Sequence, residues 1–240
     1  MRKIIMTNGK KRAGKDYFAD QLIKKGFVKL SIAKGLKDLA CKIAGIDYDT
    51  MEELKNEGKS FKVNLDDFQK NFQTELRAML SFYNNDIDIF YIINKVDEFR
   101  VWEVVDVFID NNEIENTWVD ARKFLQNMNI FKIIFNDDDI WINMVIREMQ
   151  KIDEDIVLAD FRFPNEYAAV AKAFDGVVSV KVIGKNLYEK DEYDNHISET
   201  SLNDWEFDYH INNTFWHSGS MFWQVQGLLQ TLDLEENKDD

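Results

Sequence analysis

The sequence predicts an α/β fold, a parallel sheet flanked by helices, with a mostly helical inserted lobe. Two apolar runs, Ile4 to Met6 and Ile156 to Ala159, indicate buried strands, and helical patterns follow both. Strands that alternate with helices imply right-handed crossovers and a parallel sheet with helices on both faces. The alternation is interrupted by mostly helical material. We therefore expect one domain over residues 1–240, with a core at about 1–45 and 151–233, an inserted substrate-binding and lid lobe at about 46–150, and an acidic tail at 234–240.

After the first strand, the chain continues with alternating patterns. From Lys15 the apolar positions follow helical spacing, and Gly26 supplies a stop signal. Phe27 to Ile32 then form a second short apolar run, which predicts a strand. Leu36 to Ile43 carry another helical stripe, which Gly45 closes. These patterns predict a β-α-β-α order at the start of the core.

The inserted lobe is less regular in sequence. Residues 46–63 are polar and are predicted as loop, whereas Asn64 is a suitable N-cap for a long helix with an apolar face from Leu65 to Leu80. Residues 86–119 are rich in Ile, Val, Phe and Asp and have an ambiguous period. A strand hairpin and a helix both fit that segment.

The end of the lobe and the return to the core have clearer patterns. We expect a helix from near Val119 and another over Trp141 to Met149. After the strand that begins at Ile156, Pro164 favours the first turn of a helix, which runs to Phe174. Val177 to Ile183 are predicted as the next strand.

Composition excludes several classes of function. With 240 residues the chain can bury a core without disulfides, and the single cysteine, Cys41, excludes an internal one. The 30 Lys and Arg against 44 Asp and Glu give a formal charge of −14, which disfavours nucleic-acid and anionic-membrane partners. No apolar run reaches the roughly 18 residues of a membrane span, and the start lacks a signal-peptide pattern. We expect a soluble, cytoplasmic protein.

The segment Gly9 to Lys15 matches the pattern G-x-x-x-x-G-K between a predicted strand and a predicted helix. Glycines let the backbone turn so that its N–H groups face a phosphate. The following helix adds its positive N-terminus, and the lysine can reach the β- and γ-phosphates of a nucleotide. The pattern therefore predicts a phosphate loop and a P-loop NTPase-type sheet, although a basic turn with two glycines is the alternative.

Two features distinguish this loop from a typical phosphate loop. Asp16 stands where most such loops carry a Ser or Thr that binds Mg²⁺, and a carboxylate could hold the ion through water. Lys10, Lys11 and Arg12 add three cations. Two phosphorylated substrates that meet here would explain them, because phosphoryl transfer concentrates negative charge. A solvated basic loop explains them as well.

A second group of polar residues follows the strand that begins at Ile156. Asp160 comes directly after four apolar residues. This pattern resembles the strand of P-loop enzymes that ends in an Asp at the Mg²⁺ site. This position is the carboxyl edge of the sheet, where ligands bind in open α/β folds. Arg162 can pair with a phosphate or with Glu166 in a structural ion pair. Both uses of arginine are common.

Other candidate residues have structural alternatives. Ser198 and Glu199, next to His196, can cap a helix, and Trp118 and Trp141 can stack on a base or belong to the core. The three His and one Cys lack the spacing of a zinc site. No Gly-x-Ser-x-Gly elbow is present, which disfavours nucleophilic hydrolysis.

Taken in order, the motifs resemble those of the bacteriophage deoxynucleoside monophosphate kinases, whose phosphate loop also has Asp after the lysine. The similarity covers most of the chain, and only the loop is specific by itself. The matching segments are Gly9 to Asp16, Ile32 to Asp38, Arg122 to Gln126, Asp139 to Trp141, the set Asp160, Arg162 and Glu166, the set His196, Ser198 and Glu199, and Asp208 to Asn213.

The resemblance implies a P-loop kinase that transfers the γ-phosphoryl of ATP to a deoxynucleoside monophosphate (dNMP) with Mg²⁺, in the cytoplasm of a phage host. It implies that Lys15, Arg12 and Asp160 are catalytic and that Asp16 holds Mg²⁺ through water. ATP would be bound by Gly9, Arg12, Ala13, Gly14, Lys15, Asp16 and Tyr17. The dNMP would be bound by Lys11, Leu36, Lys37, Arg122, Gln126, Trp141, Arg162, Glu166, His196 and Glu199.

The chain departs from this family at two places. Asn127, Met128 and Asn129 stand where many relatives have a Gly-Thr pair, and Tyr17 stands where a small hydroxyl is common. Two alternatives remain: a P-loop kinase of another phosphorylated acceptor, such as dephospho-coenzyme A, and a nucleotide-binding protein without transfer. Homodimers are common among soluble enzymes, and nothing in the sequence marks such an interface.

Overall fold

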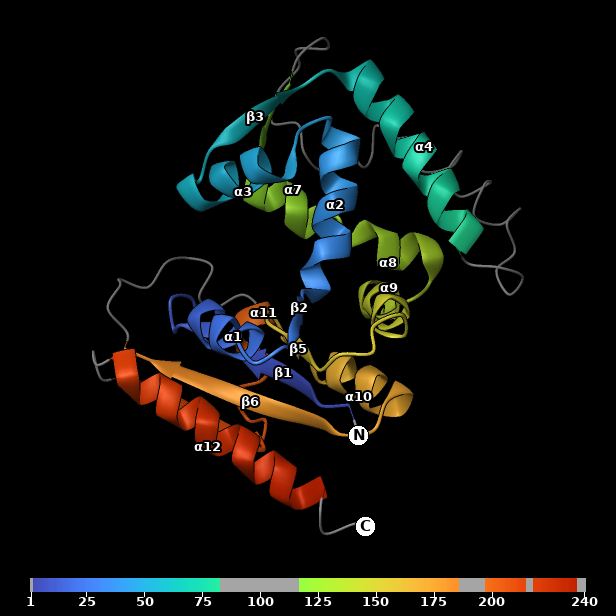
Figure 1. Ribbon diagram of the computed structural model, residues 1–240. Helices are drawn as coiled ribbons and strands as arrows, with labels where there is room; N and C mark the ends of the chain where they lie inside the picture. Colours follow the sequence, from blue (N-terminus) through green and yellow to red (C-terminus); the bar gives the residue numbers. More distant parts are fainter. Residues whose placement is uncertain (1, 83–116, 186–196, 215–217, 237–240) are drawn as a thin grey trace. The chain divides into compact units, whose positions relative to one another are not determined.

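A computed structural model describes residues 2–82, 117–185, 197–214 and 218–236 (Figure 1). Its contacts divide the chain into two units: Met1–Ile32 with Ile142–Asp240, and Ala33–Trp141. The sequence places the insertion at 46–150, whereas the contacts assign nearly all of the helix after the second strand to the second unit as well. Within the ranges described, no helix is both long and apolar enough to cross a membrane.

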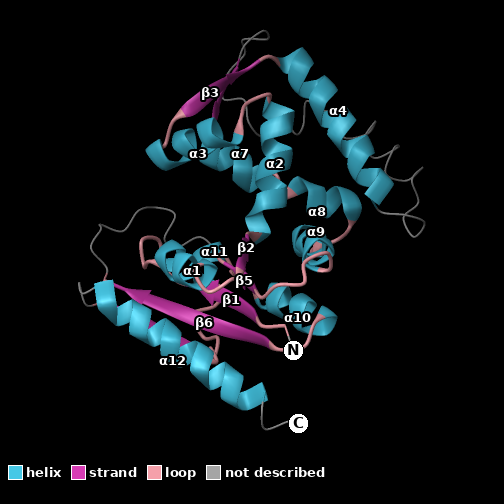
Figure 2. Ribbon diagram, in the orientation of Figure 1, coloured by secondary structure: helices cyan, strands magenta, loops and turns pink. Residues whose placement is uncertain are grey.

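The first unit contains a five-stranded sheet in which every pairing is parallel, with the order β2-β5-β1-β6-β7. Figure 2 shows helices around the labelled strands β1, β2, β5 and β6. This arrangement, with flanking helices and a glycine loop after the central strand, confirms the predicted P-loop-type α/β fold. The strands are β1 Ile4–Asn8, β2 Val28–Leu30, β5 Ile156–Leu158, β6 Val177–Gly184 and β7 Tyr209–Asn213.

Alternation along β1 creates two cores, one on each face of the sheet. Ile5 packs in a buried cluster with residues of α1 (Lys15–Ile23) and α12 (Ser218–Glu236). Ile4 and Met6 face the other way, into a cluster with residues of α9 (Ile140–Met149) and α10 (Pro164–Ala173). Each fully buried aliphatic side chain of this kind contributes about 1.5–3 kcal/mol. The central strand is thereby fixed, and with it the loop that follows.

The second unit has an aromatic core between helices and a small antiparallel sheet. Phe124 packs edge-on against Phe61 and Phe68, at ring-centroid distances of 5.5 and 5.9 Å, and Phe72 lies 5.4 Å from Phe131. The elements are α2 Ile32–Ala44, α3 Tyr48–Glu57, β3 Ser60–Val63, α4 Leu65–Phe82, β4 Thr117–Asp120, α7 Ala121–Asn127 and α8 Ile130–Phe135, and β3 pairs with β4.

The prediction of a loop over residues 46–63 was wrong, because this segment contains both α3 and β3. The side chain of Asp47 caps α3 by accepting a hydrogen bond from the Thr50 amide at 2.9 Å. Gly58 ends the helix with a φ of +64°. Only Met51 of α3 is buried, so the helix has almost no apolar periodicity, and its two caps were the available signal.

Other boundaries differ less. The Asn64 cap is confirmed, because its side-chain oxygen accepts from the Asp67 amide at 3.1 Å. The second strand is shorter than predicted, at Val28–Leu30. The helix expected near Val119 begins at Ala121, after β4, and residues 86–116 of the ambiguous segment lie outside the described residues.

The C-terminal region also differs from the sequence analysis. Helix α12 was not predicted, and it continues to Glu236, into the expected acidic tail. Its buried residues, among them Met221 and Val225, belong to the same core cluster as α1. β5, α10 and β6 follow the predicted order. The short helices α8 and α11 (Ile197–Thr200) were not predicted.

Candidate functional site

The predicted phosphate loop joins β1 to α1 in the first unit (Figure 1). β1 ends at Asn8 and α1 begins at Lys15, which is the strand–loop–helix placement that the motif requires. The Ala13 amide donates to the Lys10 carbonyl at 3.0 Å. The loop therefore leads into the N-terminus of a helix, whose partial positive charge favours an anion.

Both glycines of the motif are required by close packing. Gly14 has a φ of +99°, and a β-carbon there would collide with the side-chain amide of Asn213. That amide donates to the Ala13 carbonyl at 3.0 Å. A β-carbon at Gly9 would lie 2.5 Å from the Val182 carbonyl oxygen. The loop is thus packed directly against the ends of β6 and β7.

Arg12 has a φ of +63°, in the left-handed region, although it is not a glycine. Such a conformation costs about 1–3 kcal/mol and persists at ligand-binding loops whose surroundings determine the backbone. The side chains of Lys10, Lys11 and Arg12 are exposed. Their exposure agrees with a solvated basic loop and with a loop that receives two phosphorylated substrates.

The ammonium group of Lys15 lies over its own loop. It donates to the Gly9 carbonyl at 2.5 Å and to the Lys10 carbonyl at 3.1 Å, and the residue is half-buried. A phosphate oxygen is a stronger acceptor for an ammonium group than a neutral carbonyl is. Lys15 is therefore placed where it can exchange these carbonyls for phosphate oxygens.

Asp16, the residue after the loop lysine, forms an ion pair with β2. Its Oδ1 lies 2.8 Å from Lys29 Nζ, and the Asp16 side chain is 86% exposed. An ion pair this exposed contributes about 0–1 kcal/mol to stability. Its electrostatic effect is more relevant here, because Lys29 offsets the negative charge that Asp16 brings next to a phosphate-binding loop.

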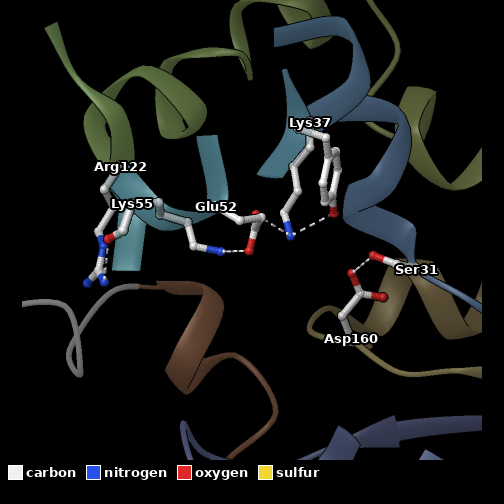
Figure 3. Close-up of polar contacts among 7 residues, drawn as sticks. Ser31, Lys37, Glu52, Lys55, Arg122 and Asp160 are labelled. Carbon is white, nitrogen blue, oxygen red and sulfur yellow. Dashed lines mark hydrogen bonds and ion pairs between the residues drawn. The ribbon is translucent and has the colours of Figure 1, made fainter. Parts of the chain in front are cut away.

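Asp160 follows β5 and is oriented through both carboxylate oxygens. Ser31 Oγ donates to Oδ2 at 2.6 Å (Figure 3). The Ile32 amide donates to Oδ1 at 2.7 Å. Mg²⁺ is commonly held by one or two carboxylates together with water and phosphate oxygens, and Asp160 fits that role. No three His, Cys, Asp or Glu side chains in the described part of the chain group closely enough to hold a metal by themselves.

Lys15 and Asp160 line one cavity of the first unit. Four of the lining side chains are cationic (Lys10, Lys15, Arg162 and Lys181), and Asp160 is the one carboxylate among them. A cation-rich concavity in a chain with a formal charge of −14 focuses attraction for anions at that place. The full lining is Asn8, Gly9, Lys10, Lys15, Asp160, Phe161, Arg162, Lys181, Ser198 and Asn203.

Lys181 and Asn8 were not identified from the sequence. Lys181 Nζ donates to Asn8 Oδ1 at 2.5 Å and lies 4.8 Å from the Phe207 ring centroid. Asn8 in turn donates through Nδ2 to the Phe161 carbonyl at 2.7 Å. These contacts connect β6, the end of β1 and the segment after β5, and so hold together the residues that line the cavity.

Arg162 and Glu166 lie together at the start of α10. Glu166 Oε2 accepts from the backbone amides of Arg162 and Phe163 at 2.7 and 2.9 Å, which caps the helix. Arg162 Nη1 donates to the Ser198 carbonyl at 3.2 Å while the residue lines the cavity. His196 lies outside the described residues.

The second unit brings together the predicted residues Lys37 and Arg122 with two that were missed, Glu52 and Lys55 (Figure 3). We call these four residues the Glu52 cluster. Lys37 Nζ lies 2.9 Å from Glu52 Oε1, and Lys55 Nζ lies 2.6 Å from Glu52 Oε2. Arg122 Nη2 donates to the Lys55 carbonyl at 3.5 Å. One carboxylate thus bridges two ammonium groups from α2 and α3, beside an arginine from α7.

Burial perturbs the ionisation of this cluster. Burial raises the pKa of Glu52, but hydrogen bonds from Lys55 and Lys37 outweigh it and hold the pKa below its usual value. The pKa of Lys55 is lowered, first by burial and then by repulsion from Lys37, against the opposing effect of Glu52. Burial and Lys37 thus disfavour the charged form of Lys55, and Glu52 favours it.

The other predicted residues are scattered between core and surface. Trp141 is 6% exposed, and its ring centroid lies 6.1 Å from that of Phe131, so it packs as a core residue. Tyr17 is exposed, and Leu36 and Gln126 are half-buried. For Glu199 the structure describes the backbone alone. Trp118, the other tryptophan considered for base stacking, is exposed on β4.

Comparison with known proteins finds similarity among solved structures. No protein-family model matches the chain, and no curated protein matches it. The crystal structure of TT1252 from Thermus thermophilus is similar over 96% of this chain and 97% of that chain, with 12% sequence identity and a TM-score of 0.41. The fold class itself is evident from this chain's strand order, parallel pairings and glycine loop.

Proposed function

We propose that the chain is an ATP-dependent phosphotransferase that converts a dNMP and ATP into the diphosphate and ADP. The observation that carries this proposal is the glycine loop between β1 and α1, with Lys15 and Asp160 in one cation-lined cavity. The order of the motifs along the chain, which resembles the phage kinases, supports the choice of acceptor.

The reaction needs charge neutralisation more than covalent chemistry. An oxygen of the acceptor phosphate attacks the γ-phosphorus of ATP, and the bond from that phosphorus to the β–γ bridging oxygen breaks, so that ADP leaves. The loop amides and Lys15 would bind the β- and γ-phosphates, and Arg12 would add positive charge to the transferring group. None of these groups has to form a bond to the substrate.

Mg²⁺ would be held by Asp160, whose carboxylate Ser31 and the Ile32 amide orient, with Asp16 as a second contact through water. The ion would supply positive charge that offsets the negative charge of the phosphates. Lys29, paired with Asp16, would keep that carboxylate from repelling the phosphates. The chain thus offers two carboxylates for the ion. Hydrogen bonds orient Asp160, and Lys29 offsets the charge of Asp16.

The acceptor would be bound mainly by the second unit. Lys37 and Arg122 of the Glu52 cluster are basic groups that can pair with a phosphate. Arg162, in the first unit, borders the nucleotide cavity. The proposal therefore assigns the two substrates to different groups of residues, which separate variants can test.

The test is a turnover panel with ATP, Mg²⁺ and, as acceptors, each of the four dNMPs and dephospho-coenzyme A, with ADP release as the readout. ADP that appears only with a particular dNMP supports the proposal. Turnover only with dephospho-coenzyme A identifies a different phosphorylated acceptor and overturns the dNMP assignment. Tight ATP binding without turnover on any of these acceptors overturns the assignment as an enzyme.

A further inference from the structure

We propose that Lys181 binds the phosphate chain of the nucleotide in the cavity beside the glycine loop, and that Asn8 positions Lys181 for this contact. This inference rests on the proposed function and deepens it, because it adds strand β6 to the nucleotide site. Neither residue belongs to the motif from Gly9 to Lys15. Both line the cavity that Lys15 and Asp160 share.

The end of β6 is packed against the glycine loop. A β-carbon at Gly9 would lie 2.5 Å from the Val182 carbonyl oxygen, and a β-carbon at Gly184 would lie 2.5 Å from the Cα atom of Ala13. The loop is therefore in contact with β6 near both of its ends. Because the two backbones touch, the strand segment that carries Lys181 is held close to the loop amides.

Strand alternation directs Lys181 toward the cavity. Val180 and Val182 belong to the core cluster that includes α1 and α12, and successive side chains of a strand point to opposite faces. Lys181 thus faces the other side, where its Nζ donates to Asn8 Oδ1 at 2.5 Å and lies 4.8 Å from the Phe207 ring centroid. Its half-buried side chain borders the cavity, at the carboxyl edge where open α/β sheets bind their ligands.

Asn8 holds the ammonium group from a fixed position. Asn8 and Lys181 are paired in register on β1 and β6, and Asn8 Nδ2 donates to the Phe161 carbonyl at 2.7 Å. A side chain that is already restrained loses less conformational freedom when it binds a ligand. An ammonium group has three N–H donors, so Lys181 can donate to a phosphate oxygen and to Asn8 at the same time.

The alternative is that Lys181 only connects two strands. The backbones of β1 and β6 are already paired, from Ile4 with Val177 to Asn8 with Lys181, so a side-chain link adds little to their association. A phosphate oxygen is also a stronger acceptor for an ammonium group than a neutral amide oxygen is. A connecting role predicts that loss of the ammonium group lowers stability and leaves nucleotide affinity unchanged. Our proposal predicts a loss of nucleotide affinity.

The first experiment measures the binding of a non-hydrolysable ATP analogue with Mg²⁺ by calorimetry, without an acceptor. We compare the intact protein with Lys181→Gln, Lys181→Arg and the control Lys172→Gln, which removes an exposed lysine of α10 outside the cavity lining. Lys181→Gln should weaken binding about ten- to hundredfold, the cost of one hydrogen bond to a charged group. Lys181→Arg should retain part of the affinity, and Lys172→Gln all of it.

Unchanged analogue affinity in a folded Lys181→Gln protein would overturn the inference, and the kinase assignment would still rest on the turnover panel. Conversely, an intact protein that binds the analogue through Lys181 but never releases ADP would sink the kinase assignment and leave the contact in place. If Lys181→Gln does not fold, Lys181→Met replaces it, because methionine keeps an apolar stem over Phe207 and lacks the ammonium group. An affinity equal to that of the intact protein in this variant would overturn the inference as well.

A contact with phosphate, as opposed to the nucleoside, is tested with inorganic tripolyphosphate. Lys181→Gln should weaken tripolyphosphate by about the same factor as the ATP analogue, because the lost contact is to a phosphate oxygen. Lys15→Ala, which should weaken both ligands, is the reference that places tripolyphosphate at the glycine loop. A loss for the analogue with none for tripolyphosphate would contradict the phosphate contact.

The positioning role of Asn8 is tested by a double-mutant cycle. Asn8→Ala alone should weaken the analogue about three- to tenfold, the cost of one neutral hydrogen bond. In a Lys181→Met background the same change should have no effect on affinity, because Asn8 acts through Lys181. A structural role of Asn8, through its bond to the Phe161 carbonyl, would produce the same loss in both backgrounds and would contradict the positioning role.

Discussion

The two units hold their cations in different ways. In the first, two of the four cavity cations, Lys10 and Lys15, belong to the glycine loop, and two backbone carbonyls of that loop accept from Lys15. In the second, Lys37, Lys55 and Arg122 come from three helices, and a single carboxylate connects the two lysines. The glycine loop is formed by residues that are close in sequence, whereas the Glu52 cluster depends on tertiary packing.

This difference has a physical consequence. A glycine loop is determined by close packing of the backbone, so a small steric change should damage it. The Glu52 cluster is determined by charge, so it should tolerate changes of shape and respond to changes of charge and pH. The predictions below test these two sensitivities, from the largest expected effect to the smallest.

The largest effect is expected for Lys15→Ala. Loss of the ammonium group should lower turnover by about a thousandfold or more, because the charge on the transferring phosphoryl group is no longer offset. Stability should change little, since Lys15 Nζ donates to two carbonyls of its own loop. The measurement is ADP release, with Lys24→Ala, an exposed lysine at the end of α1, as the control. Near-normal turnover in the Lys15 variant would contradict the loop assignment.

Gly14→Ala tests the steric sensitivity of the loop. An alanine there would have a strained left-handed backbone, and its β-carbon would collide with the Asn213 side-chain amide. The strain and the collision together should lower the free energy of unfolding by about 2 kcal/mol or more. Gly26→Ala is a matched control, because Gly26 has a φ of +97° with nothing within 4 Å of its β-carbon position.

The Gly26 variant should therefore show the cost of backbone strain alone, about 1–2 kcal/mol, and should keep its affinity for ATP. Urea unfolding and ATP titration of both variants provide the comparison. If Gly14→Ala and Gly26→Ala lost the same stability and both kept their affinity for ATP, contact with β7 would not be what fixes the loop.

Arg122→Ala tests the second unit. Removal of the guanidinium should raise the KM for the dNMP about ten- to hundredfold and leave the KM for ATP nearly unchanged. Steady-state kinetics with each substrate varied in turn measure the two constants. Lys123→Ala, the exposed neighbour on α7, serves as the control. An equal rise in both KM values would mean that the two units do not divide the substrates as we propose.

The smallest effect concerns acid stability. Because the pKa of Glu52 is lower in the folded protein than its ordinary value of 4.5, its contribution to stability is present at neutral pH. That contribution is lost as the pH falls below about 4.5 and through the folded-state pKa. Urea unfolding at pH 7 and pH 3 should therefore show a smaller acid loss for Glu52→Gln than for the intact protein. Identical losses would contradict the ion pairs of Glu52.

The sequence allowed the first unit's loop to be predicted because its signal is contiguous. Gly9, Gly14 and Lys15 stand at fixed spacing between a strand and a helix. The strand, the motif and the helix can each be recognised without knowledge of the fold. Asn213, which holds the loop through the Ala13 carbonyl, lies 200 residues away. No local pattern indicates a contact over that separation, so this support could not be derived from the sequence.

The second unit was harder to predict for a related reason. Helix α3 buries only Met51 and has no apolar stripe, so its segment was assigned to a loop, and Glu52 and Lys55 were lost with it. Their i,i+3 spacing is a usable signal once the helix is recognised. The meeting of that pair with Lys37 depends on how α2 packs beside α3, which propensity and periodicity do not determine.

The most direct test of the central claim is a crystal structure with a non-hydrolysable ATP analogue and Mg²⁺. The account predicts β- and γ-phosphate oxygens within hydrogen-bonding distance of the amides from Gly9 to Lys15. It also predicts that Lys15 Nζ leaves the Gly9 carbonyl, now 2.5 Å away, for a phosphate oxygen. An analogue bound elsewhere, with Lys15 still on that carbonyl, would contradict the assignment of the loop and the function built on it.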